Sequence, residues 1–152
     1  MTPATTRNIL IFLLGFLGAG ALFGGAVLII SPTGELIGMP LSMLSPSPFH
    51  SFLLPGILLF LVLGVFPLFL IYALIQKVDS PFAEHFNLFK DMRWPWSFSI
   101  YQAFALIVWI QVEMVLLHAV HWLHTFYVFY GVAMLVVALL PQIRDLYKKQ
   151  DT

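Results

Sequence analysis

The chain has 152 residues, of which 61% are hydrophobic and 9% are charged, whereas soluble domains average about 45–50% apolar and about 25% charged residues. A soluble globular domain is therefore excluded, and an integral membrane protein is indicated. The sequence contains no cysteine, which excludes disulfides, thiolate nucleophiles and cysteine-bound metal centres. The basic and acidic residues balance at seven each, so the charge gives no indication of a nucleic-acid partner.

Apolar segments predict four transmembrane helices, because roughly 20 apolar residues make one helical crossing of the hydrocarbon. They extend over about 9–30, 55–76, 97–118 and 125–140. The first begins like a signal peptide but is too long for one, and we interpret it as a retained span. Pro67 removes a hydrogen bond near the middle of the second, where we expect a kink. Ser99 and Gln102 have the spacing of a capping box that would open the third.

The basic residues predict the orientation of these spans. All seven lie on one side of a four-span topology: Arg7, Lys77, Lys90, Arg93, Arg144, Lys148 and Lys149. The positive-inside rule places that side in the cytoplasm, together with both termini. An odd number of crossings would put basic segments on both sides. The predicted fold is therefore an all-α, four-helix transmembrane bundle that forms a single domain over residues 1–152.

The two longer connections are expected to lie against the membrane. The outer loop that follows the first span is rich in Pro, Gly and Ser but also carries apolar residues such as Leu36, Leu44 and Phe49. We expect it to lie on the bilayer surface or to cover the outer mouth of the bundle. In the inner connection, Phe82 and Phe86 are spaced as on one face of an amphipathic helix, which would begin near Ser80.

Glu113 is the most informative polar residue within a span. It lies about 24 Å along the third helix from Ser97, a turn or two below the outer boundary. Intramembrane acids usually face a bundle interior or a cavity. Gln102, Trp109 and Glu113 share one helix face, whereas Gln111 is rotated by about 160° from Glu113. Two hypotheses stay open for Glu113, a structural hydrogen bond between helices and a functional acid that carries a proton or pairs with a nearby histidine.

Histidines gather on the outer side, where His118, His121 and His124 end the third span and His50 lies in the first outer loop. Imidazoles bind zinc or copper, and residues three apart lie near one another on a helix. The same segment must also contain the turn between the third and fourth spans. A zinc or copper site and a polar outer turn are therefore both open, and no other cofactor is indicated.

Small residues recur along the first span, and they are Gly15, Gly18, Ala19, Gly20, Ala21, Gly24 and Gly25, with Gly20 and Gly24 as one pair four residues apart. Small residues at a spacing of four let helix backbones approach closely within lipid. We expect these glycines to pack the first span against another span of the same chain, with a homodimer or partner contact as the alternative.

The outer loop also carries a resemblance. The elements Gly-Met-Pro-Leu-Ser at 38–42 and Ser-Pro-Phe at 47–49 are similar to those of a group of small bacterial four-span membrane proteins of unknown function. The resemblance implies the same architecture and a bacterial cytoplasmic membrane. No catalytic residue is indicated, so we expect a non-enzymatic structural or accessory element with the lipid bilayer, a membrane protein or a second copy as its partner. The alternative is a small transporter of protons or metal ions that uses Glu113 and the outer histidines.

Overall fold

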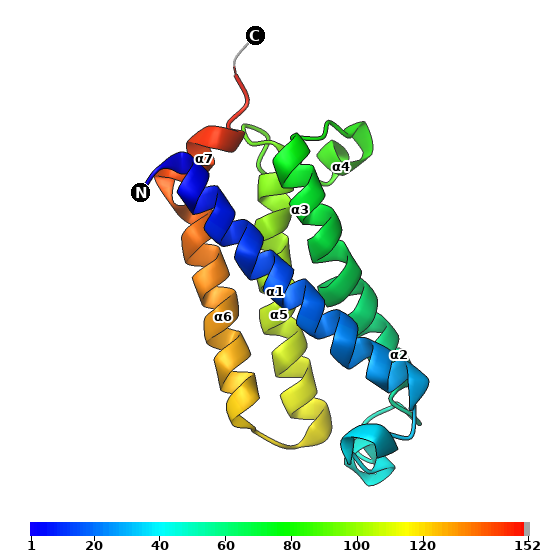
Figure 1. Cartoon of the computed structure of the whole chain (residues 1–152). Coiled ribbons are helices and arrows are strands. Elements are labelled where there is room, and N and C mark those ends of the chain that lie inside the picture. The colour runs from blue at the N-terminus through cyan, green and yellow to red at the C-terminus, as the bar shows by residue number, and fades with distance from the viewer. Residues whose placement is uncertain (151–152) are drawn as a thin grey trace.

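The computed structural model describes residues 1–150 and is an all-α bundle of long helices (Figure 1). The first, third and fourth spans are α1 (Pro3–Ile30), α5 (Trp94–Leu117) and α6 (Trp122–Leu139). The second span, Leu53–Gln76, consists of α2 (Leu53–Leu58), the π-helical segment η3 (Leu59–Val65) and α3 (Phe66–Gln76). All four spans are long and apolar enough to cross a membrane, and the chain is a multi-pass membrane protein.

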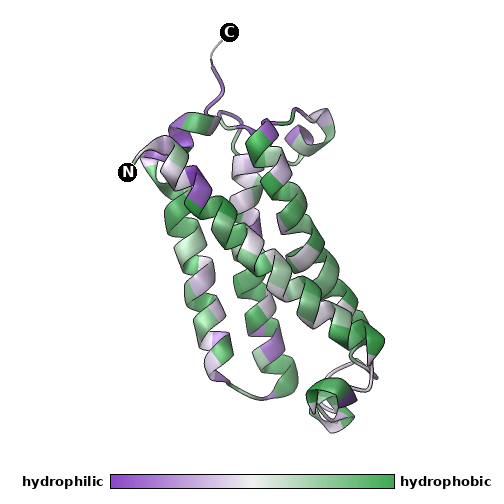
Figure 2. Cartoon of the chain, viewed as in Figure 1, coloured by the Kyte–Doolittle hydropathy of each residue, from purple (hydrophilic) through white to green (hydrophobic). Residues whose placement is uncertain are grey.

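The connections separate into two ends of the bundle. Both termini lie at one end with α4 (Pro81–His85) and α7 (Pro141–Tyr147), while η1 (Glu35–Ile37), η2 (Leu41–Leu44) and the α5–α6 turn lie at the other (Figure 1). We call these the basic end (residues 1–8, 77–93 and 141–150) and the histidine end (residues 31–52 and 118–124). Figure 2 shows the long helices as largely hydrophobic between the two ends. All seven basic residues belong to the basic end.

The starts of α1 and α5 are set by capping and by proline, and they differ from the predicted ones. α1 begins at Pro3, because the Thr2 side chain accepts the Thr5 N–H at 3.2 Å and proline fits the first helical turn. The predicted capping box of Ser99 and Gln102 is wrong. α5 begins earlier, with Pro95 in its first turn, and the Ser99 hydroxyl lies inside the helix, where it donates to the Pro95 carbonyl at 2.9 Å.

Glycines bring α1 into close contact with the second span. A Cβ atom added at Gly25 would lie 2.7 Å from the Cβ and backbone nitrogen of Phe60. On the facing helix, a Cβ added at Gly56 would lie 2.7 Å from Leu28 Cβ. Both distances are shorter than two carbon atoms can approach, so the backbones pack as closely as they do only because these positions carry no side chain.

Only some of the glycines predicted to pack α1 lie at its closest approach to the second span. An added Cβ at Gly15, Gly20 or Gly24 would meet its nearest neighbour at 3.5, 3.6 and 3.5 Å, which is ordinary van der Waals contact. Gly18 and Gly25 are the tight positions. They are seven residues apart and therefore share the helix face that points to the second span.

The second span accommodates Pro67 through η3, the π-helical segment that lies just before it. At the end of η3 the N–H of Phe66 donates to the carbonyl of Leu61, five residues earlier. The next N–H in this register would belong to Pro67, which has none, so the Val62 carbonyl loses that partner. The buried Gln102 side chain of α5 donates to the Val62 carbonyl at 3.1 Å. A neighbouring helix thus supplies the hydrogen bond that Pro67 removes.

Candidate functional site

A cavity of about 220 Å³ lies between α1, η3, α5 and α6 toward the histidine end. α1 and α6 diverge toward this end (Figure 1), and both helices contribute to the cavity wall. Most of the wall is apolar, and the polar groups come from Trp109, Glu113, His124 and Tyr127. We call it the Glu113 cavity. A second cavity, of about 100 Å³, lies on the other side of Trp109 and Glu113 against the loop 31–52.

Glu113 and His124 face each other across the α5–α6 hairpin. Glu113 lies one turn before the end of α5, and His124 lies in the first turn of α6. The Nε2 atom of His124 is 3.9 Å from Oε2 of Glu113, and the two side chains are 12% and 29% exposed. This distance exceeds that of a direct hydrogen bond. Gln111 is exposed and lies away from the cavity, in a shallow apolar groove on the other face of α5.

Trp109 adds a buried donor to the same cavity. Its indole Nε1 is buried and has no hydrogen-bond partner among residues 1–150. The Glu113 carboxyl lies beside the indole, one turn further along α5, but the two groups do not reach hydrogen-bond geometry. Because an indole N–H can only donate, the cavity holds a donor that lacks an acceptor.

The cap of α6 determines which nitrogen of His124 faces the cavity. The backbone N–H of His121 donates to His124 Nδ1 at 3.0 Å, and the N–H of Leu123 donates to His121 Nδ1 at 3.4 Å. A ring nitrogen that accepts a hydrogen bond carries no proton. The proton of the His124 ring is therefore on Nε2, the atom that points toward Glu113.

The outer histidines form the turn between α5 and α6. His118 ends α5 in a left-handed conformation with φ 48°, and its Nδ1 lies 2.6 Å from the Val115 carbonyl, to which it donates. His50 is exposed in the loop 31–52. No group of three or more His, Asp or Glu side chains within residues 1–150 is placed to hold a metal ion. In the described part of the chain, His118 ends α5, and His121 and His124 cap α6.

At the basic end, α4 begins where the sequence predicted. The Ser80 hydroxyl accepts the Ala83 N–H at 3.2 Å, and Pro81 is in the first turn. The helix ends after five residues, at His85. Phe82 and Phe86 are 77% and 56% exposed, which suits a segment that anchors this end in the membrane interface.

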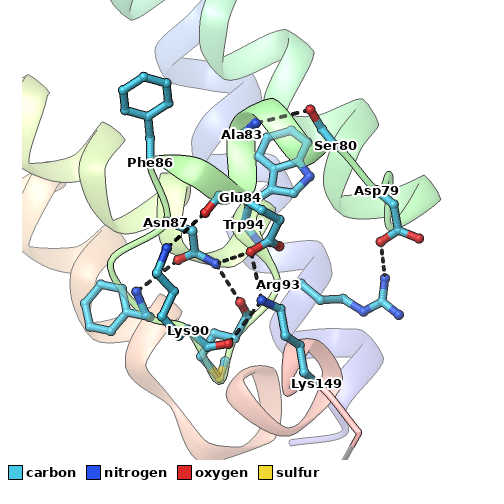
Figure 3. A network of polar contacts seen from close by, with 12 residues as sticks. Asp79, Ser80, Ala83, Glu84, Phe86, Asn87, Lys90, Arg93, Trp94 and Lys149 are labelled. Carbon is cyan, nitrogen blue, oxygen red and sulfur yellow. Dashed lines mark hydrogen bonds and ion pairs between the residues drawn. The ribbon is translucent and has the colours of Figure 1, made fainter. Parts of the chain in front are cut away.

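Glu84 connects this segment to the C-terminal residues, a contact the sequence analysis missed (Figure 3). Its Oε2 accepts from Lys149 Nζ at 2.8 Å and from Asn87 Nδ2 at 3.0 Å, and its Oε1 accepts from the Trp94 backbone N–H at 3.0 Å. We call these four residues the basic-end latch. Glu84 and Lys149 are 65 residues apart in sequence, and the only sequence signal was an acid placed among the phenylalanines of α4.

Two opposing effects act on the pKa of Glu84. Burial raises it, but the hydrogen bonds from Lys149, Asn87 and the Trp94 N–H outweigh burial, and the pKa lies below its ordinary value. The carboxylate is therefore charged at neutral pH.

Burial also raises the pKa of Tyr147, in α7, to about 12. The Tyr147 hydroxyl therefore keeps the proton that it donates to the Leu74 carbonyl at 2.8 Å.

Comparison of the chain with protein-family models, with curated proteins and with solved structures gave no match.

Proposed function

We propose that the chain is a non-enzymatic structural or accessory element of a bacterial cytoplasmic membrane, with both termini in the cytoplasm. Its partners are the lipid bilayer and either a membrane protein or a second copy of the chain. The single basic end supports this orientation, since cytoplasmic segments are enriched in Lys and Arg. The resemblance of the loop elements at 38–42 and 47–49 supports the bacterial setting.

This proposal rests on the hydrogen bonds that polar side chains of the spans make with neighbouring helices. Gln102 donates to the second span, Tyr130 donates to the Leu13 carbonyl of α1 at 2.7 Å, and Trp96 donates to the Ala138 carbonyl of α6 at 2.7 Å. Each hydrogen bond joins two helices. Polar groups that served catalysis or conduction would instead have to meet a substrate or an ion. The pattern therefore supports a rigid scaffold.

An accessory element should leave the membrane together with its partner. We expect native mass spectrometry of the chain, extracted from its own membrane in mild detergent, to find a stoichiometric complex. Co-expression of tagged and untagged copies distinguishes the two kinds of partner, because only a homo-oligomer carries both forms. A monomer without any bound protein in every gentle extraction would contradict the proposal.

A second candidate function, proton or metal-ion handling, is favoured by the facing pair of Glu113 and His124. Both groups exchange protons, and they share a cavity near the histidine end. Toward the basic end the cavity is closed by apolar side chains, among them Leu17, Leu63 and Leu106. Ion transfer would therefore require the second span to move, and η3 is the irregular segment where it could do so.

Substitution of Glu113 separates the two candidates. If the chain carries ions, Glu113→Gln should abolish proton flux in proteoliposomes loaded with a pH-sensitive dye, because the amide cannot release a proton. Glu35→Gln is the matched control, since Glu35 is an exposed acid of the loop 31–52. Wild-type flux in the Glu113→Gln protein, with the same helix content by circular dichroism, would eliminate ion handling through this residue.

A further inference from the structure

The Glu113 cavity presents two N–H groups to whatever occupies it. The Trp109 indole N–H is buried and unpartnered among residues 1–150. The protonated Nε2 of His124 faces the same space, 3.9 Å from the Glu113 carboxyl. A hydroxyl group of a ligand can bridge this gap, because it accepts from the His124 N–H and donates to the carboxylate, whereas a carbonyl oxygen can only accept from the two N–H groups. The polar part of the cavity is thus suited to a group that accepts hydrogen bonds.

The size and the apolar wall of the cavity define the rest of the occupant. A closed apolar cavity of about 150 Å³ is large enough to hold benzene, so one of about 220 Å³ holds a six-membered ring with a polar substituent. The wall is built from residues such as Leu17, Leu59, Leu106 and Ile110, which favours an uncharged group inside the cavity. A charged end would lose more hydration than these walls return.

The position of the cavity indicates where such a molecule enters. Gly20 of α1 and Leu123 and Tyr127 of α6 line it, and Gly20 is exposed on the surface of the bundle. The cavity therefore opens between α1 and α6, toward the lipid layer rather than toward the water at either end. A chain attached to the bound ring could leave through this opening and lie among the lipid tails.

We propose that the Glu113 cavity binds an uncharged, oxygen-bearing part of a membrane amphiphile, whose carbonyl or hydroxyl oxygen accepts hydrogen bonds from Trp109 and His124. Two sources share this chemistry. One is the ester carbonyl of a membrane phospholipid, and the other is a free apolar ketone or alcohol dissolved in the bilayer.

A fluorinated aryl ketone tests the proposal directly. The protein is reconstituted in nanodiscs and titrated with 1-(4-fluorophenyl)-1-decanone, whose ¹⁹F signal reports binding. We expect a saturable signal at one ligand per chain. The matched compound 1-decyl-4-fluorobenzene has the same ring and chain without the carbonyl, and it should bind about a hundredfold more weakly, because it loses two hydrogen bonds of about tenfold each. Equal affinity of the two compounds would overturn the recognition of an oxygen atom.

Substitutions at the mouth of the cavity locate the site. A Cβ atom at Gly20 meets only the Tyr127 hydroxyl, at 3.6 Å, so Gly20→Leu should fold and its side chain should block the opening. Ala19→Leu is the control, because Ala19 is an exposed neighbour that does not line the cavity. We expect the saturable signal to disappear in Gly20→Leu and to persist in Ala19→Leu. The same signal in both variants would place the binding elsewhere and refute the proposal.

Trp109→Phe tests the donor itself. The substitution keeps an aromatic ring and removes the indole N–H, so the affinity for the ketone should fall about tenfold and stay about tenfold above that of decylfluorobenzene, because the hydrogen bond from His124 remains. The affinity for decylfluorobenzene should stay unchanged, which shows that the cavity is intact. An unchanged affinity for the ketone would exclude Trp109 as the recognising group and contradict the proposal.

The lipid distinguishes the two sources. Nanodiscs of dioleoyl phosphatidylcholine contain ester carbonyls, whereas the corresponding diether lipid has none. Tighter binding of the ketone in the diether lipid would identify the ester carbonyl as the natural occupant, since it then no longer competes. Equal binding in both lipids would identify a free amphiphile. Binding of the ketone that does not saturate in either lipid would refute the site.

Discussion

Replacing Gly25 with alanine is expected to lower the free energy of unfolding by about 1–3 kcal/mol, the usual cost of inserting atoms into a well-packed contact. The added Cβ would lie 2.7 Å from the Cβ and the backbone nitrogen of Phe60. A backbone atom cannot rotate away as a side-chain end can, so α1 and η3 must separate along their contact. Unfolding in mixed micelles with increasing dodecyl sulfate measures the change.

The adjacent Gly24 supplies the control. Its added Cβ would meet only the end of the Leu59 side chain, at 3.5 Å. Gly24→Ala should therefore leave stability unchanged or raise it by up to about 1 kcal/mol, because alanine favours the helix more than glycine does. Equal effects of the two substitutions would mean that helix propensity, and not the contact between α1 and η3, determines stability at this crossing.

Replacing Glu84 with glutamine is expected to open the basic-end latch. The amide cannot form the ion pair with Lys149, and the contribution of about 1–3 kcal/mol that charged hydrogen bonds make here should be largely lost. The N–H of Lys149 donates to the Asp91 carbonyl at 2.8 Å and the N–H of Arg93 to the Tyr147 carbonyl at 2.8 Å. Exchange of these two amide hydrogens, followed by NMR, should become at least about tenfold faster in the variant.

The latch should also respond to acid. Because the folded-state pKa of Glu84 is lowered, its stabilising effect is complete above the ordinary carboxyl pKa and is lost as the pH falls through the lowered value. Protection of the Lys149 amide in the wild type should decrease over that range after correction for intrinsic exchange. The Glu84→Gln variant should show no such decrease. A wild type that keeps full protection below the lowered pKa would contradict the role of the carboxylate.

Asp79→Asn is the matched control for this acid-to-amide change. Asp79 pairs with Arg93 at 3.1 Å, but its side chain is 90% exposed. Exposed ion pairs contribute about 0–1 kcal/mol, so protection of the Lys149 amide should be nearly unchanged. An effect as large as that of Glu84→Gln would indicate that the charge of the whole segment, rather than the latch, holds the C-terminal residues.

The sequence predicted those features that depend on local composition. Four apolar segments identified the spans, and Ser80 with Pro81 identified the start of α4, because hydropathy and capping act over a few neighbouring residues. The face shared by Gln102, Trp109 and Glu113 follows from helical rotation alone. Two of these residues line the Glu113 cavity, and Gln102 lies buried against the second span.

Features that depend on pairs of distant segments could not be predicted in this way. The partner of Gln102 is a carbonyl 40 residues away, and that carbonyl is free only because of the π register before Pro67. Glu84 and Lys149 likewise meet only after the ends of the bundle have come together. The tight glycines of α1 could not be told apart from its other small residues, because a small-residue pattern does not reveal which face of a helix meets its neighbour.

The wider turn of η3 also determines which residues of the second span face α1. In a regular α-helix, Gly56 and Gly64 would be rotated by about 800° from each other, roughly 80° beyond two full turns. Both glycines nevertheless meet α1, one at Leu28 and the other at Leu22, because the π register uses more residues for each turn. Deleting one residue within η3 would make the span a more regular helix and would swing one glycine away from α1.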